Sequence, residues 1–387
     1  MKIALLGYGT VGSGTYDVLL NSPEVEVKRV LVRQVRACGA SEVTSDFQDI
    51  LNDPEIAIVA EVMGGTEPAR SYVLSAMEAG KHVVSANKEL ICNSYRELYD
   101  VAAKNNVCLR HTACAGGGIQ WLYNLERAMR CDDIMEIGGV MNGTSNYILD
   151  SMQKGMDFSS ALKKAQALGY AEAEPGADID GFDAARKCAL SANMAFQTVI
   201  RESEMDVAGI RFVERYDIEF GEARKMVLKL TVHAAKEQNG VSAYAEPSFV
   251  SDASQEANVP DNYNLLSLVG KHLKKQSFFG QGAGKMPTGI TVAQDILDIA
   301  RGLVKPLKSE FLPLNVDNTA AVHRYYVRSC ADLSHESLSD LMCEQIEMGK
   351  FRAYITKPVS VHAMHVLVKK LRESDPRLFF AGLSEND

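Results

Sequence analysis

Residues 2–21, KIALLGYGTVGSGTYDVLLN, decide how the first part of this chain folds. An apolar run ends at Gly7, and Gly7, Gly9 and Gly12 form the pattern G-x-G-x-x-G around a helix-like stretch that starts at Thr10. Glycines at these positions allow a tight turn and let a pyrophosphate approach the first amides of the helix. The stretch therefore predicts a β-strand, a phosphate-binding turn and a helix, in the order that dinucleotide-binding folds use.

Strand-like and helix-like stretches continue to alternate up to residue 113. The expected strands are 25–33, 56–65, 81–87 and 106–113, and the expected helices are 10–21, 67–80 and 88–105. Such alternation is typical of a doubly wound parallel sheet, so we expect a Rossmann-type α/β domain for dinucleotide binding over residues 1–125.

The pattern changes near residue 120. The expected helices are 120–129, 145–153 and 158–169, and the expected strands are 134–143, 226–236 and 243–251. This mixture predicts an α+β domain for substrate binding and dimerisation over residues 126–287.

The last part of the chain begins with a strongly periodic helix at 288–302, and we expect residues 288–310 to return to the cofactor domain. Alternation then resumes, with expected strands at 324–330, 351–356 and 378–383 and expected helices at 336–348 and 360–374. Residues 321–385 therefore predict a short third domain of α/β type.

The overall composition indicates a soluble globular protein. The chain has 387 residues with 41 basic and 50 acidic side chains, which makes nucleic acid an unexpected partner. We find no apolar stretch of membrane-spanning length and no signal segment, and we expect a cytoplasmic protein. The eight cysteines lack the spacing of zinc sites or disulfide frameworks, and we interpret the pair His362 and His365 as packing residues rather than metal ligands.

The end of the second strand carries information about the cofactor. An enzyme that prefers NAD places Asp or Glu there, against the ribose 2′-hydroxyl, whereas this chain has Arg33, Gln34 and Arg36. Guanidinium groups attract a 2′-phosphate, so we expect NADP in preference to NAD. The alternative is that both arginines are solvated loop residues.

A second candidate site lies in the stretch DIDGFDAARKCAL, residues 178–190. Asp183 and Lys187 are i,i+4 neighbours on a helix whose other positions are mostly apolar. The acids that precede them are Glu172, Glu174, Asp178 and Asp180. Carboxylates beside one lysine suit a substrate with an ammonium group, and such a lysine can exchange a proton. An exposed surface ion pair is the alternative explanation.

A second lysine, Lys88, directly follows the expected strand 81–87. The carboxyl ends of parallel strands are where open α/β sheets bind ligands. The macrodipole disfavours a cation at the start of a helix, so this lysine suggests either a compensating anion or a catalytic role.

Eight segments together resemble the homoserine dehydrogenase family. They are GYGTVG, GGTEPAR with GKHVVSANKEL, AGGGI, NGTSNYIL, ALGYAEAEPGADIDGFDAARK, the GI pair at 209–210, and GQGAGKMPT, and they span about residues 1–310 in the family's order. The resemblance implies the NAD(P)-dependent interconversion of L-homoserine and L-aspartate 4-semialdehyde, in the synthesis of threonine, methionine and isoleucine.

The resemblance also assigns roles to individual residues. Lys187 matches the proton-transferring lysine, and Lys88 matches a lysine that assists between cofactor and substrate. Glu172, Asp178 and Asp183 match residues that hold the amino acid. The expected cofactor-binding residues, with Arg33 added from the argument above, are Gly7, Gly9, Thr10, Val11, Gly12, Arg33, Met63, Lys88 and Gly284.

Relatives of this kind hold a sodium or potassium ion through backbone carbonyls. The matching residues here are Thr112, Ala115, Gly117 and Ile119. The usual Tyr-Glu pair that enters this loop is replaced by His111 and Thr112, and the usual Pro that follows it is replaced by Gln120.

The tail resembles a shortened regulatory domain of the ACT type, and binding of threonine there is a hypothesis. The resemblance also suggests a homodimer or homotetramer that acts on a small-molecule substrate. Two further interpretations of the residues stay open: a dehydrogenase of another small alcohol, and a non-catalytic NADP-binding sensor.

Overall fold

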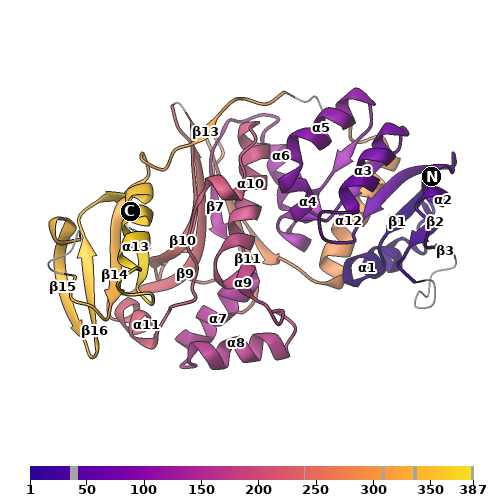
Figure 1. Cartoon of the computed structure of the whole chain (residues 1–387). Helices are drawn as coiled ribbons and strands as arrows, with labels where there is room; N and C mark the ends of the chain where they lie inside the picture. Colours follow the sequence, from indigo (N-terminus) through magenta and orange to yellow (C-terminus); the bar gives the residue numbers. More distant parts are fainter. Residues whose placement is uncertain (35–41, 239, 307–309, 334–337, 385–387) are drawn as a thin grey trace. The chain divides into compact units, whose positions relative to one another are not determined.

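The computed structural model describes residues 1–34, 42–238, 240–306, 310–333 and 338–384 (Figure 1). The chain forms two compact units, each made of segments that are distant in the sequence. The first unit contains Met1–Cys131, Asn193–Val199 and Gly280–Pro313, and the second contains Asp132–Ala192, Ile200–Phe279 and Leu314–Asp387. The middle and the end of the chain therefore share one unit.

The first unit is built on a parallel sheet. Its strands, in spatial order, are β3 (Val43–Thr44), β2 (Glu26–Leu31), β1 (Lys2–Leu6), β4 (Ile56–Glu61), β5 (His82–Ser85) and β6 (Leu109–Arg110). This order is that of doubly wound dinucleotide-binding sheets, so the predicted Rossmann-type fold is confirmed. Ile3 to Leu6 and Ile58 to Ala60 are fully buried, as expected when helices cover both faces of a parallel sheet.

The helices of the first unit follow the predicted pattern except at residues 48–51, where we expected no helix, and at residues 88–105. They are α1 (Thr10–Leu19), α2 (Gln48–Leu51), α3 (Ala69–Glu78), α4 (Lys88–Asn93), α5 (Tyr95–Lys104), α6 (Trp121–Ala128) and α12 (Lys285–Ala300). We expected one helix over 88–105, but the chain forms α4 and α5 with a break at Ser94. The side chains of Asn93 and Ser94 can hydrogen-bond to nearby backbone groups in place of the helix, which favours a break at these two residues.

Helix α12 packs closely against α1. A Cβ atom on Gly14 would lie 2.2 Å from the carbonyl oxygen of Lys285, and one on Gly289 would lie 2.7 Å from the carbonyl carbon of Gly14. Larger residues at either position would force the two helices apart. This contact places the start of α12 beside the helix that follows the glycine turn.

The second unit is built on a mixed sheet. Its main strands, in spatial order, are β12 (Lys274–Gln281), β11 (Tyr263–Gly270), β7 (Ile134–Val140), β9 (Met226–Lys236), β10 (Gly240–Ser251), β18 (Phe379–Leu383), β14 (Val322–Ser329), β16 (Phe351–Thr356) and β15 (Met342–Met348). The short strands β8 (Asp206–Val207), β13 (Asn315–Val316) and β17 (Val359–Ser360) join at β10 and β14. Because β18 pairs in parallel with β10, the tail continues the sheet of the middle segment.

The helices of the second unit are α7 (Gly143–Gln153), α8 (Phe158–Ala167), α9 (Gly176–Ile179), most of α10 (Phe182–Phe196), α11 (Arg215–Glu222) and α13 (Val361–Leu371). Our prediction of a helix over 336–348 is wrong in its described part. Ser339–Leu341 is a single 3-10 turn, and Met342–Met348 forms β15, which pairs antiparallel with β16. Pairing with a neighbouring strand outweighs the weak local preference of this mixed polar segment.

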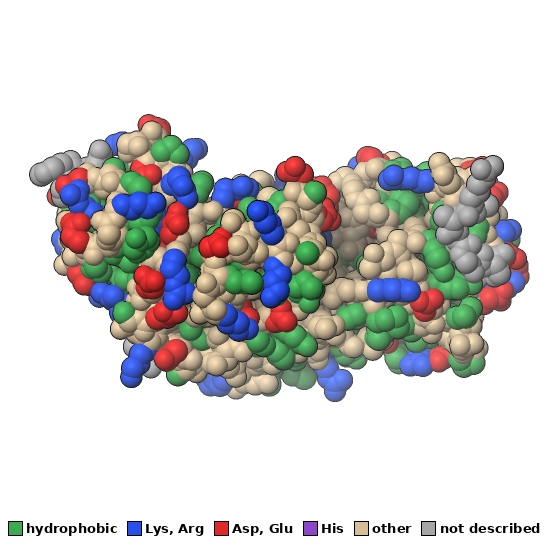
Figure 2. Space-filling model, turned by 90° about the horizontal axis from the view of Figure 1, so that it is seen from below, with side chains coloured by type: hydrophobic (Ala, Val, Ile, Leu, Met, Phe, Trp, Pro, Cys, Tyr) green, Lys and Arg blue, Asp and Glu red, His purple; other side chains and the backbone are tan. Residues whose placement is uncertain are grey.

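The surface agrees with the composition. Acidic and basic side chains are interspersed on the face that Figure 2 shows. Among the residues that the structure describes, no helix has the length and apolar character needed to cross a membrane. The described cysteines are free thiols, and those at 92, 108, 114 and 188 are buried.

Candidate functional site

The glycine turn between β1 and α1 fits a pyrophosphate. Gly7 has a φ of 107°, and a Cβ atom on Gly12 would lie 2.3 Å from the carbonyl oxygen of Gly7. A Cβ atom on Gly9 would meet nothing within 4 Å, and Gly9 directly precedes α1 and provides no side-chain cap. Open space therefore lies over the first amides of the helix, which is where a phosphate group binds.

The other predicted cofactor residues lie mostly along the same edge of the sheet. Gly7 follows β1, Arg33 follows β2, Met63 follows β4 and Lys88 follows β5, so all four lie near carboxyl ends of parallel strands. The Arg33 side chain is exposed, whereas Met63 and Lys88 are half-buried. This edge is where doubly wound sheets bind dinucleotides.

Three more predicted cofactor residues lie in the same unit. Thr10 and Val11 begin α1, and Gly284 directly precedes α12 with a φ of 128°. Arg36 lies outside the described residues.

In the second unit, Lys187 and Asp183 form a buried ion pair on adjacent turns of α10. Lys187 Nζ lies 2.7 Å from Asp183 Oδ2 and donates a hydrogen bond to the carbonyl oxygen of Met141 at 2.8 Å. Asp183 is 4% and Lys187 7% exposed, so the pair is not a solvated surface contact. The alternative explanation of an exposed pair is therefore wrong.

Asn142 joins this pair to Asp178. Its side-chain amide donates to Asp178 Oδ1 at 2.7 Å and to Asp183 Oδ2 at 2.8 Å, and its Oδ1 caps α7 by accepting from the amide of Ser145. Burial raises the pKa of Asp178, and the nearby Asp183 carboxylate raises it further. One neutral amide thus holds two carboxylates close to a lysine.

The remaining acids of the predicted cluster behave differently. Glu172 is exposed, and the described contact at this residue is made by its backbone carbonyl, which accepts from Gln166. Asp180 pairs with Arg211 at 2.6 Å, outside the network of Lys187. The structure thus brings Asp178, Asp183 and Lys187 together, and the side chain of Glu172 lies free of that network.

Two residues that lie in buried hydrogen-bond networks, Asn142 and Glu61, were not identified from the sequence. Asn142 lies within the quoted segment NGTSNYIL, but its amide gave no signal of bridging two acids. Glu61 ends β4 and is fully buried, where it accepts hydrogen bonds from Ser85 and Asn87 at the end of β5. A lone carboxylate at the end of an apolar run, in IAIVAEVMGG, was the available signal.

The predicted ion loop is held by α12. Asp295 accepts hydrogen bonds from the amide and the hydroxyl of Thr112, and the Thr291 hydroxyl donates to the carbonyl oxygen of Gly117 at 2.8 Å. A Cβ atom on Gly117 would lie 2.4 Å from the carbonyl oxygen of Gly282. Two residues one turn apart on α12 therefore hold the loop of the four predicted ligands at Thr112 and at Gly117.

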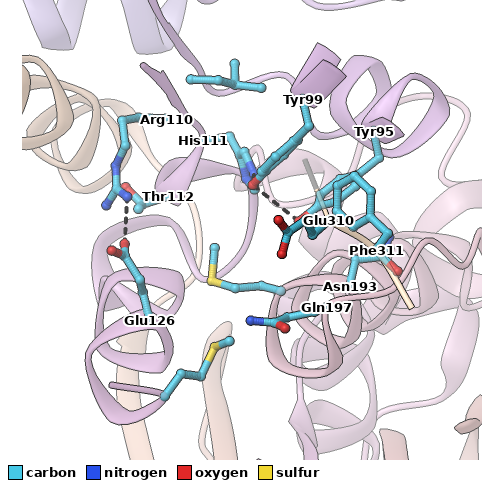
Figure 3. A pocket seen from close by; sticks show the side chains of 13 residues that line it. Tyr95, Tyr99, Arg110, His111, Thr112, Glu126, Asn193, Gln197, Glu310 and Phe311 are labelled. Atoms are coloured by element: carbon cyan, nitrogen blue, oxygen red, sulfur yellow. Dashed lines mark hydrogen bonds and ion pairs between the residues drawn. The ribbon is translucent and has the colours of Figure 1, made fainter. Parts of the chain in front are cut away.

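A cavity of about 350 Å³ lies beside this loop in the first unit (Figure 3). Tyr95 and Tyr99 stack with ring centroids 4.6 Å apart, and His111 and Phe311 contact both rings. The Tyr99 hydroxyl lies 2.9 Å from His111 Nε2. Burial lowers the pKa of His111 to about 4, with a further contribution from Arg110, so the ring is neutral at neutral pH.

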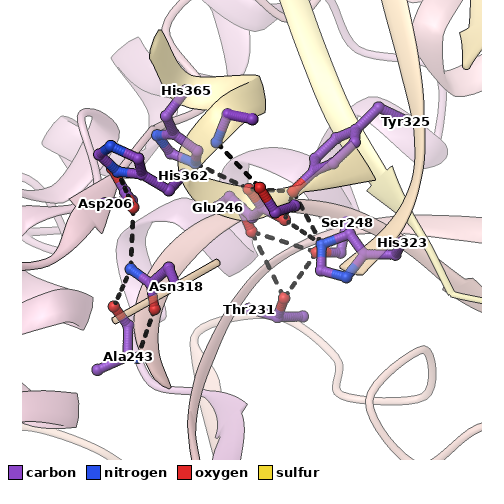
Figure 4. Close-up of polar contacts among 12 residues, drawn as sticks. Asp206, Thr231, Ala243, Glu246, Ser248, Asn318, His323, Tyr325, His362 and His365 are labelled. Carbon is purple, nitrogen blue, oxygen red and sulfur yellow. Dashed lines mark hydrogen bonds and ion pairs between the residues drawn. The ribbon is translucent and has the colours of Figure 1, made fainter. Parts of the chain in front are cut away.

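We expected packing roles for the two tail histidines, but His362 is exposed and His365 is the one that is largely buried (Figure 4). His362 Nδ1 lies 3.3 Å from Asp206 Oδ2, and His365 Nε2 lies 2.9 Å from the fully buried carboxylate of Glu246. His323 contacts the same carboxylate at 2.9 Å. Burial opposes the charge of Glu246, but the two histidines outweigh it and lower its pKa. In the described part of the chain, no cluster of His, Cys, Asp and Glu suits a metal ion.

Family models match both units. The model described as "Homoserine dehydrogenase, NAD binding domain" matches residues 7–112, and the one described as "Homoserine dehydrogenase" matches residues 121–297. The homoserine dehydrogenase of Synechocystis sp. is 38% identical over 316 residues, which cover 77% of this chain and 73% of the relative.

Solved structures agree with these matches. A homoserine dehydrogenase from Thiobacillus denitrificans has a TM-score of 0.89 and 28% identity, covering 100% of this chain and 98% of the other. A hyperthermophilic archaeal homoserine dehydrogenase in complex with NADPH has a TM-score of 0.69 at 22% identity, covering 79% and 99% of the two chains, so it speaks to the fold alone.

Proposed function

The chain belongs to the homoserine dehydrogenase family of NAD(P)-dependent oxidoreductases, and we propose that Lys187 exchanges the proton when L-homoserine and L-aspartate 4-semialdehyde are interconverted. This reaction serves amino-acid biosynthesis. The observation that carries the proposal is the burial of the Lys187 amine between Asp183 Oδ2 and the carbonyl oxygen of Met141.

Oxidation of homoserine removes two hydrogens from the C4 alcohol, one as hydride and one as a proton. An NADP held by the glycine turn, Arg33, Met63, Lys88 and Gly284 would supply the acceptor for the hydride and its electron pair. The neutral amine of Lys187 takes the hydroxyl proton while the C4–O single bond of the alcohol becomes the C=O double bond of the aldehyde. In the reverse direction the ammonium of Lys187 returns the proton to that oxygen. Asp183 and the carbonyl of Met141 orient the amine and stabilise the ammonium that forms.

The acids near Lys187 suit the amino-acid end of the substrate. We assign Asp178 and Glu172 to the substrate ammonium group and Asp183 to the alcohol end. In the first unit, Lys88 assists the reaction between cofactor and substrate. Asp178 is partly buried and already linked to Asp183 through Asn142, so its position is set before a substrate binds. Glu172 is exposed, so its carboxylate is accessible to a substrate.

For the cofactor we propose NADP in preference to NAD. Arg33 is exposed directly after β2, where a carboxylate would repel a 2′-phosphate and a guanidinium attracts it. The archaeal neighbour that was solved with NADPH has the same fold. The residues that would hold the cofactor are those of the glycine turn, with Arg33, Met63, Lys88 and Gly284.

We also propose that the carbonyls of Thr112, Ala115, Gly117 and Ile119 hold a sodium or potassium ion. Backbone carbonyls suit hard monovalent cations, and α12 holds this loop at Thr112 and at Gly117. Activity that rises with potassium or sodium at constant ionic strength supports this site, and activity indifferent to both ions removes it. A homodimer or homotetramer, and binding of threonine by residues 321–385, stay predictions.

The activity is tested by following NADPH absorbance with L-homoserine and NADP as substrates. We expect turnover with L-homoserine, and we expect other small alcohols to be poor substrates. A preference for a different alcohol would point to another dehydrogenase. Tight NADPH binding without turnover of any alcohol would point to a sensor.

A further inference from the structure

We propose that Glu61 is a positioning residue that ties together the loops after β4 and β5 and provides the negative charge that faces the start of α4, where Lys88 lies. This inference deepens the proposed function, because it concerns how Lys88 is held. It follows from a buried network that lies entirely in the first unit.

Glu61 contacts both loops through its two carboxylate oxygens. It is the last residue of β4 and is 0% exposed. Its Oε1 accepts from the amide of Met63 at 2.8 Å and from Asn87 Nδ2 at 3.3 Å, and its Oε2 accepts from the Ser85 hydroxyl at 2.6 Å. One carboxylate therefore joins the loop at Met63 to the loop that leads into α4.

Asn87 links Glu61 to the start of α4, where Lys88 lies. Its Nδ2 also donates to the carbonyl oxygen of Gly65 at 2.7 Å, and its Oδ1 caps α4 by accepting from the amide of Leu90 at 3.1 Å. Its own amide donates to the Ser85 hydroxyl at 3.0 Å. Since α4 begins at Lys88, the place of that lysine depends on a chain of hydrogen bonds that ends at Glu61.

The charge of Glu61 also acts on this region. Burial raises the pKa of Glu61, while the donors from Ser85, Met63 and Asn87 oppose that rise. Burial raises the pKa of the neighbouring Cys114 thiol, the Glu61 carboxylate raises it further and the Lys88 ammonium lowers it. Both charges thus act on the same buried sulfur atom, whose Sγ also donates to the carbonyl oxygen of Ser85.

This arrangement explains a lysine at an unfavourable place. A cation in the first turn of a helix is opposed by the helix dipole, and a buried anion nearby offsets that effect. A buried carboxylate is costly unless several donors satisfy it, and here the donors belong to the two loops that flank the proposed cofactor edge. If the end of β4 needed only a side chain that fills this space, an apolar residue would be sufficient.

The test replaces Glu61 in the full-length protein by Gln, which keeps the shape and removes the charge. The rate at which formaldehyde and borohydride methylate Lys88 is measured across pH by peptide mass spectrometry. We expect Glu61→Gln to raise this rate at neutral pH by roughly threefold to tenfold, because loss of the anion makes the Lys88 ammonium less stable relative to the reactive neutral amine. This readout does not depend on catalysis.

Kinetics provide the second readout. For Glu61→Gln we expect kcat to fall by about tenfold or more, with KM for homoserine changed less than twofold and with the alkaline limb of the pH profile moved to lower pH. Glu61→Asp keeps the charge but reaches fewer donors, so we expect it to restore the methylation rate and only part of kcat. Ser85→Ala should weaken the network without altering the pH profile.

Glu97→Gln is the matched control, since Glu97 lies in the same unit and pairs with Arg70 at the surface. We expect this variant to match the wild type in every readout. The proposal would be overturned if Lys88 is methylated in Glu61→Gln at the same rate as in the wild type, even if the protein oxidises homoserine. If Glu61→Gln does not fold, unchanged kinetics in both Glu61→Asp and Ser85→Ala would overturn it. A wild-type protein without homoserine turnover would refute the proposed function and leave the methylation test intact.

Discussion

Lys187 Nζ and Asp183 Oδ2 lie 2.7 Å apart on adjacent turns of α10, and their side chains retain only 9% and 6% of their exposed surface. Pairs of this spacing on helices are usually solvated and contribute only about 0.3–0.5 kcal/mol. Burial changes the balance, because removing one partner of a buried pair leaves an uncompensated charge. The same i,i+4 spacing can therefore serve chemistry in one helix and solubility in another.

Replacing Lys187 by Ala should abolish most turnover while NADPH affinity stays unchanged. The variant lacks the group that exchanges the proton, whereas the predicted cofactor residues lie in the first unit. Steady-state kinetics with homoserine and NADPH fluorescence titration measure the two effects. Near-normal turnover would refute the role of Lys187.

The chain contains a matched control at the end of α7. Lys154 pairs with Asp150 at 2.6 Å with the same spacing, but its side chain is 67% exposed. We expect Lys154→Ala to retain full turnover and to change the free energy of unfolding by less than about 0.5 kcal/mol.

Replacing Asn142 by Ala should weaken substrate binding more than it affects the cofactor. Without the shared amide, the carboxylates of Asp178 and Asp183 repel each other across the site. We expect KM for homoserine to rise by about tenfold, or roughly 1.4 kcal/mol, and stability to fall by about 1–3 kcal/mol through the lost cap and the unsatisfied groups.

Asp157→Ala separates capping from substrate binding. Asp157 caps α8 by accepting from the amide of Ser160 at 3.0 Å, and this contact is exposed. The variant should lose stability through the missing cap, with unchanged kinetics. If Asn142→Ala showed the same pattern, the role of Asn142 would be capping alone.

Replacing Arg33 by Asp should move cofactor preference from NADP toward NAD. An aspartate at the end of β2 repels the 2′-phosphate and accepts a hydrogen bond from the 2′-hydroxyl. We expect the ratio of kcat/KM for NADP over NAD to fall by about tenfold or more, which corresponds to roughly 1.4 kcal/mol. Arg29→Gln, which removes the β2 arginine that pairs with Glu42, is the control and should leave the ratio unchanged. An unaltered ratio in Arg33→Asp would show that Arg33 is a solvated loop residue.

Replacing His111 by Gln should make the protein less sensitive to acid. The pKa of His111 is about 4 in the folded protein and about 6.5 when unfolded, so between these values only the unfolded state binds the proton. The free energy of unfolding therefore falls as pH decreases through this window. In His111→Gln the slope of that free energy against pH should be smaller by up to one proton, as measured by urea unfolding at several pH values. An equal slope in both proteins would contradict neutrality of the buried ring.

Much of the first unit follows from local sequence. Glycines at 7, 9 and 12 between an apolar run and a helical pattern predicted the turn that the structure contains, because only glycine tolerates the φ of 107° at Gly7 and the close approach of Gly12. The alternation up to residue 113 predicted the parallel sheet, since strands linked by helices have few other arrangements.

Local sequence was less informative where pairing partners decide. The segment 342–348 became a strand because β16 lies beside it, and its own pattern of MCEQIEM suits either a helix or a strand. Pairing between strands depends on residues distant in the chain, so the information is absent from the segment itself.

By itself, the sequence determined the glycine turn, the parallel sheet, the family and the identity of the lysines and acids. Only the tertiary structure decided that Lys187 and Asp183 are buried, that Asn142 joins Asp183 to Asp178, and that Glu61 accepts a hydrogen bond from Asn87, the residue before Lys88. The physical reason is that motifs record which groups the chain carries. Burial and hydrogen-bond partners, which set the charge and strength of those groups, arise only when segments tens of residues apart pack together.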